Sequence, residues 1–222
     1  MHSHTHSHET PAQTEGRLIR WATFYDTFTT LLTLGHVGKL RAMTVNLAQL
    51  KPGEKILDVG CGTGGVTIPA KQRVGKSGQA AGIDPAPEMI AVASKKAARA
   101  GLEIDFRVGV IESMPFPDAS FDVVTSSLMM HHLPHELQVK GLVEIRRVLK
   151  PGGRLIIADM LRLSKSLHDR LFAILTFHGS RVERFGIQDL PKIVEAAGFE
   201  NVKLSDESVL TIGFLRAVKP SP

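Results

Sequence analysis

Residues 56–65 read ILDVGCGTGG, an apolar run that changes within ten residues into a glycine-rich turn. Apolar and β-branched residues favour a strand, and clustered glycines allow a tight turn where a ligand can approach the backbone closely. In an α/β sheet, nucleotide-like ligands bind at this junction, where exposed N–H groups open the following helix. The stretch therefore predicts a strand, a ligand-binding turn and a helix.

Strand and helix candidates alternate after this turn. The helix expected over residues 135–149 stops at Lys150-Pro151-Gly152-Gly153, where proline and glycine end a helix and turn the chain. Such alternation is typical of a parallel sheet covered by helices on both faces. The strand candidates are residues 55–60, 79–84, 104–110, 121–128 and 154–160.

The C-terminal part adds an amphipathic helix over residues 187–197 and two strands over 201–205 and 209–218. The link between the two strands is too short for the crossover that parallel neighbours require, so they must form an antiparallel hairpin. Residues 51–222 are therefore predicted to form one α/β domain. Its Rossmann-like sheet has seven strands, is mostly parallel and ends in the antiparallel hairpin.

The first fifty residues divide into a tail and a helical segment. Residues 1–13 begin MHSHTHSHE, and this polar, His-rich composition predicts a flexible tail. Residues 14–50 carry apolar and aromatic side chains at three- and four-residue spacing, which predicts two helices. We expect these helices to form a lid over the carboxyl edge of the sheet. Tyr25 is a candidate catalytic residue of this lid, because its hydroxyl could orient an acceptor while its ring packs.

Two ligand classes fit the glycine turn. Gly60, Gly62 and Gly65 match the dinucleotide fingerprint G-x-G-x-x-G, whereas residues 58–64 match the pattern D-x-G-x-G-x-G of S-adenosylmethionine (SAM) dependent methyltransferases. Asp58 favours the second class, because its carboxylate would repel a pyrophosphate and attract the ammonium group of SAM. The hairpin favours it too, since a dinucleotide domain continues with parallel units.

A second acid, Asp84, ends the next predicted strand, twenty-four positions after Gly60. An acid roughly 20 residues beyond the turn accepts ribose hydroxyls in both ligand classes. The alternative role for Asp84 is to cap the helix that begins near Pro87.

Four motifs resemble, in order, those of class I SAM-dependent methyltransferases. They are ILDVGCGTGG, AAGIDPAPEMIAVA, SMPFPDASFDVV and RRVLKPGGRLIIAD. The resemblance covers residues 51–218 and is nearest to the small-molecule branch that includes ubiquinone/menaquinone-biosynthesis and phospholipid N-methyltransferases. Phe24-Tyr25-Asp26 also resembles the Tyr-Asp pair that precedes the core in those enzymes. The resemblance implies SAM as cofactor and S-adenosylhomocysteine as its product.

The resemblance also implies a set of cofactor-binding residues. The methionine end would be held by Asp58, Gly60, Gly62 and Gly64, the ribose by Asp84, and one adenine face by Pro85 and Met89. Related enzymes often place an acid after the third strand, but here Val110 occupies that position. Adenine recognition would then rest on the backbone of Ile111, with Glu112 a nearby candidate. Ser126, near the end of the fourth predicted strand, completes the set.

Methyl transfer from a sulfonium needs alignment and exclusion of water more than a catalytic metal or a covalent intermediate. We therefore predict no metal site, although the histidines of the tail could chelate a metal weakly. The loop after the fourth strand carries His131, His132 and His135, any of which could deprotonate an acceptor. The alternative is that these histidines only start a helix and pack against it.

Composition limits the partners. With 27 Lys and Arg against 22 Asp and Glu, the net charge of +5 permits peripheral contact with an anionic membrane, and the scattered basic residues do not predict nucleic-acid binding. No apolar run approaches the ~20 residues of a membrane span. The N-terminus does not read as a secretory signal, and the single Cys61 permits no disulfide within the chain, so we expect a cytoplasmic location.

Apolar side chains between residues 161 and 186 flank the expected site and indicate a small-molecule acceptor that is partly hydrophobic. A quinone precursor, a lipid or an aromatic metabolite would suit it. The alternative is that these side chains only cover the sheet. Two other functions remain open: a nicotinamide-dependent oxidoreductase, and a protein that binds SAM without transferring its methyl group.

Overall fold

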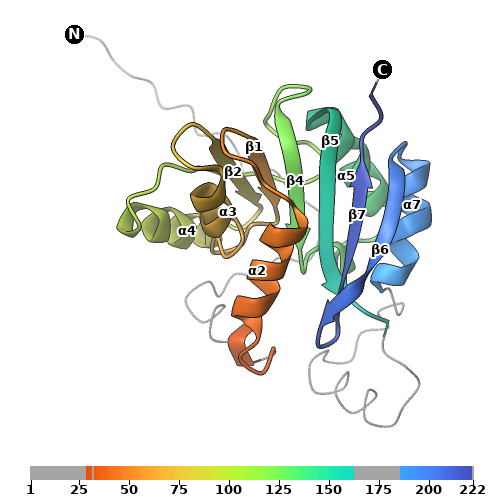
Figure 1. Ribbon diagram of the computed structural model, residues 1–222, viewed down its shortest axis with the longest axis horizontal. Helices are drawn as coiled ribbons and strands as arrows, with labels where there is room; N and C mark the ends of the chain where they lie inside the picture. Colours follow the sequence, from red (N-terminus) through yellow and green to blue (C-terminus); the bar gives the residue numbers. More distant parts are fainter. Residues whose placement is uncertain (1–28, 32, 163–185, 222) are drawn as a thin grey trace.

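The computed structural model of the protein describes residues 29–31, 33–162 and 186–221 (Figure 1). The predicted tail over 1–13, Tyr25 and most of the apolar stretch between 161 and 186 lie outside the described residues. Of the predicted lid over 14–50, only residues 29–31 and 33–50 are described, and they include helix α2, Val37–Leu47.

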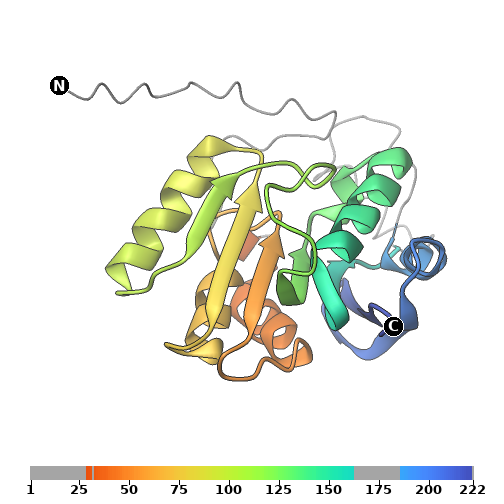
Figure 2. The same cartoon turned by 90° about the horizontal axis from the view of Figure 1, so that it is seen from above.

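One seven-stranded sheet forms the centre of the molecule, with the strand order β3-β2-β1-β4-β5-β7-β6 (Figures 1 and 2). Neighbouring strands from β3 to β5 are parallel, and β7 runs antiparallel to both β5 and β6. This confirms the predicted Rossmann-like sheet with its C-terminal hairpin. The strands are β1 Lys55–Val59, β2 Gln79–Asp84, β3 Asp105–Val108, β4 Phe121–Ser127, β5 Leu149–Met160, β6 Glu200–Val209 and β7 Ile212–Val218.

Helices cover both faces of the sheet (Figure 1). Alternate residues of a strand point to opposite faces, so Ile56 of β1 packs in a cluster with α2 and α3, while Leu57 packs in the cluster that includes α5 and α7. Both side chains are fully buried, as expected for a central parallel strand. The remaining helices are α3 Thr67–Val74, α4 Pro87–Arg99, α5 His135–Val148 and α7 Leu190–Ala196, with short 3-10 turns η1 Met130–His132 and η2 Ile187–Asp189.

Several predicted boundaries differ from the structure. In the hairpin, β6 continues to Val209 instead of ending at residue 205, and β7 begins at Ile212 instead of residue 209. Strand β5 begins at Leu149, so residues 150–153 belong to the strand rather than to a separate turn. The reason is tertiary, because Leu149 pairs with Phe121 and a register shift then accommodates the left-handed Gly152. The predicted helix over 187–197 is instead η2 followed by α7, and Pro191 lies in the first turn of α7, where proline is tolerated.

The strand order places a crevice above β1. The chain leaves β1 toward β2 on one side and later returns to form β4 on the other, so the connections diverge at the carboxyl end of β1. Ligands of open α/β sheets bind at such a switch point. Among the described helices, none has the length and apolar content needed to cross a bilayer.

Adjacent residues of α5 test the two-faced packing. Leu142 is fully buried against the sheet, whereas Val143 is 52% exposed. Leu142→Ala should lower the free energy of unfolding by about 2–5 kcal/mol, because it leaves a cavity in the core. Val143→Ala should change it by less than about 0.5 kcal/mol. Urea unfolding followed by circular dichroism measures both, and equal effects would contradict the packing described here.

Candidate active site

The glycine turn adopts the backbone that its sequence predicts. Gly60, Gly62 and Gly64 have φ angles of 71°, 51° and 80°, in the left-handed region that favours glycine. The N–H groups of Gly60 and Cys61 both donate to the carbonyl of Ile83 at 2.9 Å, which anchors the turn to the end of β2. The turn is therefore held open at the switch point.

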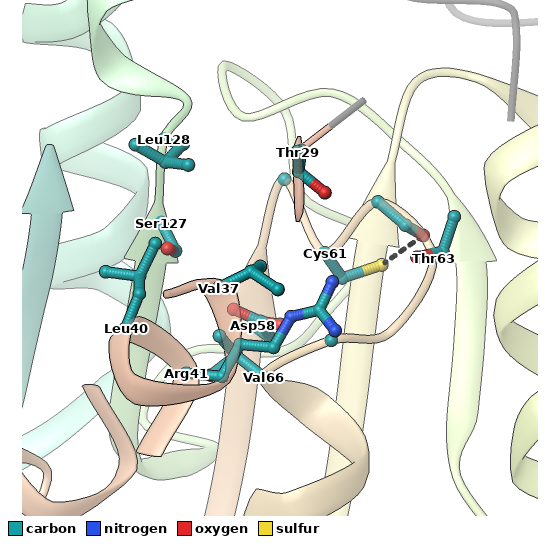
Figure 3. Close-up of a pocket in the computed structure, with 13 residues that line it drawn as sticks. Thr29, Val37, Leu40, Arg41, Asp58, Cys61, Thr63, Val66, Ser127 and Leu128 are labelled. Atoms are coloured by element: carbon teal, nitrogen blue, oxygen red, sulfur yellow. Dashed lines mark hydrogen bonds between the residues drawn. The ribbon is translucent and has the colours of Figure 1, made fainter. Parts of the chain in front are cut away.

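A pocket lies beside this turn and is shown in Figure 3. It brings together three predicted cofactor-binding residues, Asp58, Gly60 and Gly62, with residues of α2 that the sequence did not single out. Gly64 belongs to the same turn but a side chain there would face Phe106, Ile68 and Ala93 instead. The lining residues are Thr29, Val37, Leu40, Arg41, Asp58, Gly60, Cys61, Gly62, Thr63, Gly65, Val66, Ser127 and Leu128.

Asp58 is the buried anion of the pocket, with 2% of its surface exposed. Its two carboxylate oxygens accept hydrogen bonds from the hydroxyls of Thr67 at 2.7 Å and Thr125 at 2.8 Å. Burial raises the pKa of Asp58 to about 6, although the threonine hydrogen bonds act in the opposite direction. A cation near the carboxylate would lower this pKa again and favour the charged form. Sequence reasoning missed both threonines, whose only signal is a polar residue within an apolar strand or helix.

Asp84 links the end of β2 to the glycine turn. One carboxylate oxygen accepts from the N–H of Gly62 and the other from the N–H of Ala86, both at 3.0 Å. Burial raises its pKa. The bond to Ala86 supports the turn that leads into α4. The N-cap of α4 is Ala86 and no side chain caps the helix, so the capping alternative for Asp84 is wrong. The bond to Gly62 is additional and brings this carboxylate to the edge of the pocket.

The residues predicted around adenine occupy different environments. Met89, Val110 and Ile111 are buried, and the Ile111 side chain points into the core, where a Cβ on Gly141 would approach it to 2.5 Å. Only the backbone of Ile111 could therefore face a ligand. Pro85 is partly exposed at the start of the turn into α4.

Two of the predicted cofactor-binding residues each carry a buried polar atom that lacks a hydrogen-bond partner within the described structure. Oε2 of Glu112 and Oγ of Ser126 have no hydrogen-bond partner among the residues that the structure describes. Buried polar atoms normally have partners, so these two are suited to a polar ligand. Ser126 pairs with Val59 across β4 and β1, next to the glycine turn.

The loop after β4 brings His131 to a buried carboxylate. Nδ1 of His131 lies 2.5 Å from Oδ1 of Asp159, and the His131 backbone N–H donates to Oδ2 of the same residue at 3.1 Å. Asp159 is near the carboxyl end of β5 and is 1% exposed. Sequence reasoning missed this partner, whose signal is one acid at the end of an otherwise apolar strand.

The three candidate histidines are not equivalent. The His132 ring packs against His131 with centroids 3.9 Å apart and the ring planes tilted by 45°. His135 is exposed at the start of α5. The same loop lies against the glycine turn, because a Cβ on Gly60 would be 2.5 Å from Cγ of Met129. His131 is thus the oriented histidine, on a loop that borders the predicted cofactor site.

Comparison with known proteins identifies the family. A family described as methyltransferase domain matches residues 56–153. Demethylmenaquinone methyltransferase of Bacillus velezensis is 31% identical over 200 residues, covering 81% of this chain and 85% of that protein. The chain belongs to the class I SAM-dependent methyltransferases. Demethylmenaquinone methyltransferase of Thermus thermophilus is 34% identical over 179 residues, which cover 78% of this chain and 80% of that protein.

Other similar proteins have different named activities or share only the fold. Arsenite methyltransferase of Halobacterium salinarum is 34% identical over 72% of this methyltransferase, which spans 41% of that protein's length. Among solved structures, a SAM-dependent methyltransferase from Aquifex aeolicus has a TM-score of 0.63 at 24% identity. The matched region covers 80% of this chain and 88% of that protein. The [4+2]-cyclase SpnF has a TM-score of 0.66 at 21% identity, and the matched region covers 83% of this chain and 81% of that protein. These structures share the fold, and family membership selects SAM over a dinucleotide for the glycine turn.

The pKa of Asp58 predicts a pH dependence of stability. An unfolded aspartate titrates near 3.9, so between about pH 4 and pH 6 the folded state retains a proton that the unfolded state has lost. The contribution of Asp58 to the free energy of unfolding should therefore fall by up to about 3 kcal/mol as the pH rises through this window. Urea unfolding at pH 4, 5, 6 and 7 should show wild type losing stability relative to Asp58→Asn.

Asp122 provides the matched control for this measurement. Partial burial raises its pKa, but hydrogen bonds from Lys150 and from the N–H of Lys55 outweigh burial and lower the pKa overall. The difference between wild type and Asp122→Asn should therefore stay constant from about pH 5 to pH 7 and shrink only as the pH falls below about 5. A constant difference for Asp58→Asn as well would contradict the shifted pKa.

Proposed function

We propose that this methyltransferase transfers the methyl group of SAM to a small, partly hydrophobic acceptor, with His131 as the base that receives the acceptor's proton. The observation that carries the proposal is the pair formed by His131 and Asp159 on the loop beside the glycine turn. Bound SAM supplies an activated methyl group on its sulfonium. The protein must then align the acceptor, exclude water and take up a proton.

We assign described residues to each part of SAM. Asp58 offers an anion to the ammonium group, and Gly60, Gly62 and Gly64 allow the backbone to approach the methionine portion. Asp84, at the end of β2, is suited to the ribose hydroxyls. Toward the adenine we place Pro85, Met89, Val110 and the Ile111 backbone, with the unpartnered oxygen of Glu112 as a polar contact. Ser126, which pairs with Val59 beside the glycine turn, is proposed as a further cofactor contact.

The geometry of His131 suits a base. With Nδ1 directed at Asp159, Nε2 is the ring atom left to accept a proton, and the buried carboxylate would stabilise the imidazolium that forms. His132, packed against this ring, would limit its rotation. Tyr25, outside the described residues, is proposed to orient the acceptor from the N-terminal segment.

Two observations support a quinone precursor, a lipid or an aromatic metabolite as the acceptor. Apolar side chains of Val37, Leu40, Val66 and Leu128 line the pocket, and several relatives are named as demethylmenaquinone or 2-phytyl-1,4-naphtoquinone methyltransferases. Arsenite suits the chain less well. A soft arsenic centre favours several thiolates, whereas this sequence has the single Cys61, whose thiol is buried.

The proposal extends to partners and location. We place the enzyme in the cytoplasm and expect no nucleic-acid substrate. The net charge of +5 supports peripheral contact with anionic membranes, where a hydrophobic acceptor would be found.

Methyl-deuterated SAM tests the reaction and the acceptor together. Incubated with extract of cells that naturally contain the protein, the enzyme should yield a labelled, partly hydrophobic product in untargeted mass spectrometry. Asp84→Ala should weaken SAM binding by about 1–3 kcal/mol, because ribose hydroxyls lose a charged acceptor, and should reduce labelling at low SAM. SAM binding by calorimetry without any labelled product would instead show a protein that binds the cofactor but does not transfer its methyl group.

Once an acceptor is known, His131→Asn should lower kcat by a factor of about 10²–10⁴ with little change in SAM affinity. The rise of kcat with pH that a general base produces should disappear. Asp159→Asn should also lower kcat, because the imidazolium loses its buried counter-charge. His135→Asn is the matched control, since His135 is exposed, and it should leave kcat unchanged. A normal kcat in His131→Asn would assign the pair a structural role.

A further inference from the structure

Arg41 is a basic residue of α2 that faces the pocket without any role assigned to it so far. Figure 3 shows its side chain reaching from the helix across the pocket toward the glycine turn. Among the described residues that line the pocket, Arg41 is the cation and Asp58 is the anion. A ligand that carries both an ammonium and a carboxylate group could therefore place each of them near a side chain of opposite charge in this pocket.

Gly65 shows how closely the guanidinium approaches the turn. Gly65 is absent from the glycines with left-handed φ, so its backbone does not itself require glycine. A Cβ at this position would lie 2.5 Å from Nε, 2.7 Å from Cζ and 2.9 Å from a terminal nitrogen of Arg41. Any larger residue would therefore displace the guanidinium. The glycine at position 65 provides the space in which the Arg41 side chain lies.

The methionine portion of SAM carries a carboxylate as well as an ammonium group. If the ammonium lies near Asp58, the carboxylate must lie within a few ångströms of it and of the Asp58 anion. Repulsion between two carboxylates in a buried site is costly unless a cation separates or neutralises them. A guanidinium suits this task, because its planar donors match the two oxygens of a carboxylate.

We infer that Arg41 binds the carboxylate of the methionine portion of SAM and thereby fastens α2 over the bound cofactor. The inference rests on the proposed function and deepens it, since it names a residue that selects the amino-acid end of the ligand. Val37 and Leu40 of the same helix also line the pocket, so this contact couples cofactor binding to the position of an apolar wall beside the site.

Calorimetry with SAM and decarboxylated SAM tests the inference, because the two ligands differ by the carboxylate alone. The wild-type protein should bind SAM roughly ten- to a hundredfold more tightly, as expected for a charge-assisted contact. Arg41→Gln should weaken SAM binding by that factor, leave the affinity for decarboxylated SAM unchanged and so abolish the preference. Gly65→Ala keeps the arginine but displaces its guanidinium, and should reduce the preference in the same direction.

Arg73→Gln is the matched control. Arg73 is an exposed arginine of α3 that hydrogen-bonds Asn46 and does not line the pocket, so this variant should retain the full preference for SAM. Equal weakening of both ligands by Arg41→Gln would overturn the inference and assign Arg41 to packing of α2. A preference that survives in both Arg41→Gln and Gly65→Ala would also overturn it. Failure of the wild-type protein to bind either ligand would overturn the proposed function itself, and this inference with it.

Discussion

The buried carboxylate of Asp58 is the interaction on which the site depends. Burying an ionisable group is costly unless hydrogen bonds compensate, and here hydroxyls from the start of α3 and the middle of β4 donate to its two oxygens. Asp58 thereby connects β1, α3 and β4 at the point where the strand order diverges. These hydrogen bonds tie the strand before the glycine turn to the helix that follows it.

Three aspartates at the carboxyl edge of the sheet make different contacts within the site. Asp58 in β1 and Asp84 at the end of β2 hold the glycine turn from two sides, and Asp159 near the end of β5 orients His131. Parallel strands bring these acids to one edge although they are far apart in the sequence.

The fold alone does not decide the chemistry, because a [4+2]-cyclase and a methyltransferase share it with this chain at similar TM-scores. The described site combines a buried carboxylate in β1, a guanidinium beside Gly65 and a histidine oriented by Asp159 on the adjacent loop. Each of these contacts depends on an element outside the glycine turn.

The sequence by itself determined the strands that carry the core, the left-handed glycines of the turn, and Asp84 at the end of its strand. These features follow from local conformation and periodicity, which short stretches of sequence express directly. Only the tertiary structure decided the partners. Thr125 lies 67 residues from Asp58, and Asp159 lies 28 residues from His131. Arg41 meets Gly65 only because α2 folds over the turn. Strand β5 begins at Leu149 for the same kind of reason, because pairing with Phe121 overrides the local turn signal of proline and glycine. A pattern along the chain states which residues are polar or apolar, but packing decides which of them meet.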